Sequence, residues 1–87
     1  MNVIEILAKR LKELRQENNY SQYEIADMIG IAQVTYSHYE LGRRSVSIQN
    51  LVKIAQIYNV STDYLLGLSD VKIVQNKQIV LNKRICV

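Results

Sequence analysis

The stretch Ser21–Arg44, SQYEIADMIGIAQVTYSHYELGRR, contains the signals for two short helices joined by one tight turn. Ser21 and Glu24 form the S-x-x-E pattern of a capping box, which predicts that the first helix begins here. Gly30 supplies the left-handed residue that commonly ends a helix and allows a sharp turn. A second helical pattern follows and ends at Gly42. Together these signals predict a helix-turn-helix unit, in which two helices pack at a steep angle.

The second helix of this unit has an outer face without acidic residues. That face consists of Gln33, Val34, Ser37 and His38. These side chains offer hydrogen bonds or methyl contacts, which is the chemistry that reads base edges in a DNA major groove. The alternative for His38 is an exposed side chain that has no role in binding.

The rest of the chain predicts further helices with short connections. Residues 2–18 repeat apolar side chains at spacings of three and four, and Asn18-Asn19 is typical of a helix end. Residues 48–58 follow a capping Ser47, and a last short helix over 63–66 follows Ser61 or Thr62. We therefore expect an all-α bundle of five helices. Its predicted core consists of Leu7, Leu11, Leu14, Ile25, Ile29, Ile31, Tyr36, Tyr39, Leu51, Ile54, Ala55 and Leu65.

The segment from about Leu7 to Asp70 resembles the Cro/phage-repressor helix-turn-helix family of bacterial and phage transcription regulators. The resemblance is carried by LKELRQENNYSQYEIADMIGIAQ, by Glu40-Leu41-Gly42 and by SIQNLVKIAQIYNVSTDYLLG. It implies a phage-repressor-like domain over residues 1–69. It also implies a sequence-specific regulator of transcription, expected to repress, that binds a two-fold operator on double-stranded DNA as a dimer.

The resemblance assigns roles to individual residues. It implies an ion pair between Arg15 and the glutamate that ends the recognition helix, Glu40. Family members place the glutamine at Gln22 against a phosphate and pair it with the one at Gln33, and they also reach bases at the positions of Ser37 and His38. Base contacts by the amide of Gln33 and the methyl groups of Val34 are expected from their own chemistry. The expected phosphate contacts are Ser21, Gln22, Thr35, Arg43 and Arg44. A solvated loop is the alternative for the two arginines.

The sequence departs from the family pattern at a few positions. Ala32 stands where a small polar cap is usual, so the recognition helix is expected to start less firmly. Tyr36 and Tyr39 replace aliphatic residues, and they either crowd the core or direct a hydroxyl to a phosphate. Val46 replaces a common proline. Stacking of tyrosines on single-stranded bases is the less favoured interpretation, because most of them fall on inward helical positions.

Composition narrows the class of function. The net charge of +3 suits a nucleic-acid partner without requiring one. With one histidine and one cysteine, Cys86, the sequence offers no nucleophile–base pair and no metal-ligand spacing, so we expect neither an enzyme nor a metal or other cofactor. No signal peptide opens the chain and no apolar run approaches the roughly 20 residues of a membrane span, so a cytoplasmic protein is expected.

Residues 70–87 differ from the rest of the chain in composition, and they lack its helical pattern of apolar residues. They are rich in valine and isoleucine, and Asn76-Lys77-Gln78 could form the turn of a β-hairpin. An isolated hairpin is only marginally stable and exposes an edge, so residues 71–87 are expected to form a strand or hairpin that pairs with a second subunit. The alternatives are a tail that packs on the last helix, a loose tail, or an antitoxin-like module whose tail docks on a partner protein.

Overall fold

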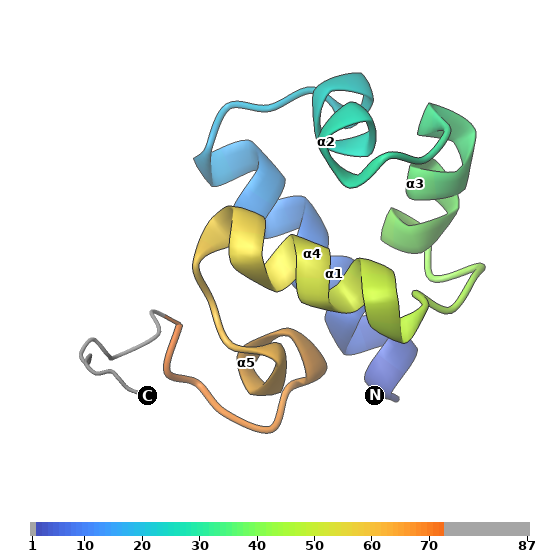
Figure 1. Cartoon of the computed structure of the whole chain (residues 1–87). Helices are drawn as coiled ribbons and strands as arrows, with labels where there is room; N and C mark the ends of the chain where they lie inside the picture. Colours follow the sequence, from blue (N-terminus) through green and yellow to red (C-terminus); the bar gives the residue numbers. More distant parts are fainter. Residues whose placement is uncertain (1, 73–87) are drawn as a thin grey trace.

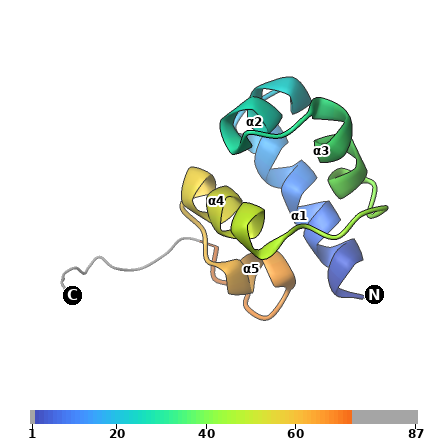
Figure 2. The same cartoon turned by 45° about the vertical axis from the view of Figure 1, so that its right-hand side comes forward.

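The computed structural model describes residues 2–72, which form five α-helices connected by short loops. Figure 1 shows them in chain order, and the second view in Figure 2 shows α4 and α5 on one side of α1 with α2 and α3 above it. The helices are α1 (Val3–Glu17), α2 (Gln22–Ile29), α3 (Gln33–Glu40), α4 (Ile48–Tyr58) and α5 (Thr62–Leu66). The predicted all-α architecture is therefore confirmed for this part of the chain.

Local capping interactions begin α2 where the sequence predicts. The Glu24 N–H donates to Ser21 Oγ at 3.0 Å, and the Ser21 N–H donates to the Glu24 carboxylate at 2.8 Å. Gly30 then adopts φ +91° and ends α2. Ala32 makes no side-chain cap for α3, as expected. A second capping box, formed by Asn2 and Glu5, begins α1, and its residues form an N-x-x-E pattern in the sequence.

The remaining helix ends follow the same local logic. Two asparagines adopt the left-handed conformation. Asn19, with φ 60°, lies shortly after the end of α1, and Asn59, with φ 55°, ends α4. Ser47 caps α4. Of the two candidate caps for α5, Ser61 is the one that accepts a hydrogen bond, from the Tyr64 N–H at 3.0 Å. The last helix therefore begins at Thr62, one residue earlier than predicted.

The core forms where α1 packs against α3 and α5, α2 against α3 and α4, and α4 against α5. Most of the predicted core residues are buried, but Ile31 and Leu51 are only partly buried at its edge. Tyr36 and Tyr39 are both buried, with ring centroids 6.3 Å apart in an edge-to-face arrangement. The two tyrosines thus fill the core between α3 and its neighbours, and the prediction of core filling is confirmed for them.

The predicted hairpin and its role in dimerisation concern residues 71–87, of which 73–87 lie outside the described residues. In residues 2–72, no helix combines the length and the apolar character needed to cross a bilayer.

Candidate nucleic-acid interface

The candidate interface is the outer surface of α3, at the edge of the bundle beside α2. Both views show this position (Figure 1 and Figure 2). The buried Tyr36 and Tyr39 fasten the inner side of α3 to the core. Gln33 and Val34 at the start of α3 are exposed. A helix that packs against the core on one side and is exposed to solvent at its first turn can present side chains to the major groove of DNA.

The structure places the other predicted site residues around this surface. Thr35, Ser37 and His38 on α3 are partly exposed, and Arg43 and Arg44 are exposed in the loop that follows it. Ser21 is exposed as well, although its hydroxyl oxygen already accepts the capping hydrogen bond of α2. The residues predicted to contact DNA, Gln22 included, are therefore all exposed or partly exposed.

A chain of hydrogen bonds connects Gln33 to the interior of the domain. The Nε of Arg15 donates to Glu40 Oε2 at 2.6 Å, and its Nη2 donates to Glu40 Oε1 at 3.1 Å. Gln22 Nε2 donates to the same Oε1 at 3.1 Å, and Gln33 Nε2 donates to Gln22 Oε1 at 2.7 Å. Arg15, Glu40, Gln22 and Gln33 thus form one network, named here the Arg15–Gln33 network.

This network fixes which way each glutamine amide points. A carboxylate only accepts hydrogen bonds, so Gln22 must turn its NH₂ group to Glu40 and its oxygen to Gln33. Gln33 must then turn its own NH₂ group to Gln22. One N–H and the oxygen of Gln33 remain for a partner outside the domain. That pair is the donor–acceptor set with which glutamine reads the N7 and N6 groups of adenine.

The charge of Glu40 is balanced within the domain. Only 4% of its side chain is exposed, against 15% for Arg15. Burial acts to raise the pKa of Glu40, but the interactions with Arg15, the Tyr36 hydroxyl and Gln22 together favour the carboxylate more strongly and hold the pKa below its ordinary value of 4.5. The same hydrogen bond raises the pKa of Arg15. The acid that ends α3 therefore stays ionised at neutral pH, and Arg15 offsets its repulsion toward phosphates.

The lowered pKa of Glu40 predicts a specific acid sensitivity. The pair contributes its full stability above the unfolded pKa of about 4.5, and that contribution is lost as pH falls through the lower folded value. Urea unfolding between about pH 5 and pH 3 should therefore show a steeper loss for the parent than for Glu40→Gln, which cannot titrate here. Parallel losses in the two proteins would contradict this assignment.

Three contacts at or near the interface were not foreseen from the sequence. Asn50 Nδ2 of α4 donates to the hydroxyl of Tyr39 at 3.2 Å, so this hydroxyl is bonded within the domain. Lys53 Nζ donates to the carbonyl of Ile29, which ends α2, at 3.2 Å. The link between Gln22 and Glu40 was also missed. These contacts join residues from different helices, and no local pattern in the sequence signals them.

Helices α2 and α3 meet through a glycine in the left-handed conformation, and α3 is exposed and polar at its first turn. This arrangement defines a helix-turn-helix DNA-binding domain. Residues 11–65 match the family model described as helix-turn-helix. The chain belongs to this family of transcriptional regulators, of the Cro/phage-repressor type, and the resemblance found in the sequence is confirmed.

Individual relatives agree with this membership. The chain is similar to the HTH-type transcriptional regulator ImmR of Bacillus subtilis (strain 168), with 44% identity over 79 residues that cover 91% of this chain and 61% of ImmR. It is also similar to the cryptic phage CTXphi transcriptional repressor RstR of Vibrio cholerae serotype O1, with 39% identity over 61 residues, 70% of this chain and 54% of RstR. This chain therefore spans less than two thirds of either regulator.

The fold also has a counterpart among solved structures. The crystal structure of a transcriptional regulator from Listeria innocua superposes with a TM-score of 0.69 at 27% sequence identity. The superposition covers 82% of this chain and 64% of that regulator.

Proposed function

We propose that this chain is a sequence-specific regulator of transcription that binds double-stranded DNA as a dimer on a two-fold operator. The observation that carries the proposal is Gln33, which is exposed at the start of α3 while the Arg15–Gln33 network holds its amide in one orientation. A side chain fixed in this way reaches a base edge with less loss of conformational entropy than a free one. Repression is the expected activity, because the similar RstR is named a transcriptional repressor.

The residues around Gln33 support the same proposal. Val34 offers a methyl contact, most naturally to thymine, and Ser37 and His38 follow one turn later on α3. Arg43 and Arg44, both exposed just after α3, would contact phosphates and set the position of α3 along the duplex. Gln22, Ser21 and Thr35 are the other proposed phosphate contacts. In a dimer, two copies of α3 would enter successive major grooves roughly 34 Å apart.

The dimer contact is proposed to lie in residues 71–87, as the pattern of the tail predicts. Sedimentation of the full chain with and without these residues tests this part of the proposal. A loss of dimer on truncation is the expected result. A monomeric full chain would contradict the dimer and favour a tail that docks on a different protein.

Replacing Gln33 by alanine should weaken binding to the selected operator by about 1–3 kcal/mol and relax the preference at one base position. Operators are obtained by selection from random duplexes, and binding is then measured against single-base variants. Arg43→Ala is the control, because loss of a phosphate contact should weaken all sequences alike and reduce the salt slope by about one. If Gln33→Ala weakens selected and random DNA equally, Gln33 does not read a base.

A further inference from the structure

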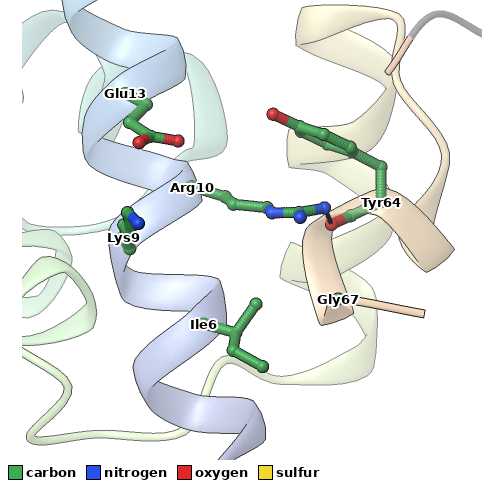
Figure 3. A pocket seen from close by; sticks show the side chains of 6 residues that line it. All are labelled: Ile6, Lys9, Arg10, Glu13, Tyr64 and Gly67. Carbon is green, nitrogen blue, oxygen red and sulfur yellow. Dashed lines mark hydrogen bonds between the residues drawn. The ribbon is translucent and has the colours of Figure 1, made fainter. Parts of the chain in front are cut away.

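Arg10 joins α1 to the end of α5 and to the chain that leaves it. Its Nη1 donates to the carbonyl oxygens of Tyr64 and Ser69, the second at 3.0 Å, and its Nη2 lies 3.4 Å from the Asp70 carboxylate. The guanidinium also lies over the Tyr64 ring, 4.1 Å from the centroid. Arg10 is one of the residues that line a pocket of about 240 Å³. Figure 3 shows its side chain reaching from α1 to the Tyr64 carbonyl. Arg10 is thus a bridge between two elements.

The segment after α5 follows one face of α1. Gly67 lies against Ile6, since a Cβ at this glycine would stand 2.8 Å from Ile6 Cγ2. Ser69 is bonded to Arg10, and the Lys72 ammonium pairs with Glu17 further along the helix. Ile6, Arg10 and Glu17 are spaced by four and seven residues, so they lie on one face of α1. Residues 67–72 therefore run along this face.

The hydrogen bonds of Arg10 contribute most to holding residues 67–72 against α1. Asp70 is fully exposed and Lys72 pairs at the surface, and ion pairs of this kind contribute little and are screened by salt. Arg10 is different, because only 18% of its side chain is exposed and it bonds the main-chain carbonyl of Ser69 in this segment as well as that of Tyr64 in α5. A main-chain contact fixes the path of the backbone and not merely the position of a side chain.

The same helix also fixes the recognition helix. Arg15, five residues after Arg10 on α1, binds Glu40 at the end of α3. One continuous helix therefore contacts both the end of α3 and the segment through which the chain leaves the domain. Both that segment and α3 are therefore held by contacts on a single helix.

We propose that Arg10 is a positioning residue that fixes the direction of that segment relative to α3, and with it the spacing between operator half-sites that a dimer accepts. The inference rests on the proposed function, in which the chain beyond residue 70 joins two subunits. Each base pair added between half-sites rotates one of them by roughly 35° about the duplex. A rigid connection would reject such a change, whereas a loose connection would tolerate it.

The first test compares Arg10→Met with Lys9→Met, the same substitution at the neighbouring cation that also lines the pocket. Each full chain is titrated against the selected operator and against operators lengthened or shortened by one and two base pairs. For the parent and Lys9→Met, a two-base-pair change should weaken binding about 100-fold, the order of a lost bivalent advantage. For Arg10→Met the penalty should fall to about tenfold or less, with unchanged affinity for a single half-site. An equal spacing penalty in all three proteins would overturn the proposal.

A second test does not depend on DNA. Spin labels at Tyr23→Cys on α2 and at Leu68→Cys, both exposed positions, report the distance between the helix-turn-helix and residues 67–72 in a Cys86→Ser background. Arg10→Met should broaden the distance distribution, whereas Lys9→Met should not. Arg10→Lys, which keeps the charge but loses the planar fork, should broaden it as well and decides the question if Arg10→Met does not fold. An unchanged distribution would overturn the role of Arg10. Failure of the parent to bind specific DNA would instead overturn the proposed function.

Discussion

Replacing Glu40 by alanine is expected to lower the free energy of unfolding by about 3–5 kcal/mol. The substitution leaves the Arg15 guanidinium, which is 15% exposed, without its carboxylate, and it also removes the acceptor of Gln22. A largely buried charge without a partner costs far more than an intact pair contributes. Urea unfolding at neutral pH measures the effect, and a loss below about 1 kcal/mol would show that the pair behaves like an exposed one.

A double variant separates this stability effect from the role of the network in recognition. Arg15→Met with Glu40→Leu removes both charges and refills the space with apolar groups, so most of the stability should return. The orientation of Gln22 and Gln33 should not return, because no acceptor remains for Gln22 Nε2. We therefore expect the double variant to fold well and yet discriminate less between the operator and its single-base variants. Full discrimination in this variant would mean that Gln33 does not need the network.

Replacing Gly67 by alanine is expected to cost about 2–4 kcal/mol, from the left-handed backbone and from overpacking together. Gly67 has φ +83°, and a Cβ there would stand 2.8 Å and 3.0 Å from two carbons of Ile6. Gly30→Ala is the matched control, because Gly30 has φ +91° but nothing within 4 Å of its Cβ position. This control should cost only about 1–2 kcal/mol, the backbone part alone.

The excess cost at position 67 should disappear when Ile6 is shortened. In an Ile6→Ala background, the further change Gly67→Ala should cost about as much as Gly30→Ala does in the parent. Thermal or urea unfolding of the parent, the three single variants and the double variant measures the difference. Equal costs at positions 30 and 67 in the parent background would contradict the close contact between α5 and α1.

The interactions that the sequence predicted are those between near neighbours along the chain. Helix caps act within about one helical turn, so the residue types at these positions directly predict where a helix begins or ends. The examples here are Ser21 with Glu24, the left-handed Gly30 and the capping Ser47. The buried stripes of α1 and α4 follow from helical periodicity in the same way. The Arg15–Glu40 contact spans 25 residues and was anticipated only through the family resemblance, not through spacing or charge.

The amino-acid sequence alone thus predicted the helices, most of their ends, most of the core and the outer face of α3, because caps act within a few residues and the helical period marks the buried side of each helix. Only the tertiary structure decided how the site is held. Gln22 bonds Glu40 across 18 residues, and Arg10 bonds the Tyr64 carbonyl across 54. Such pairings depend on which helix faces meet when the bundle closes, and a polar side chain on a helix surface has many candidate partners until that packing selects one.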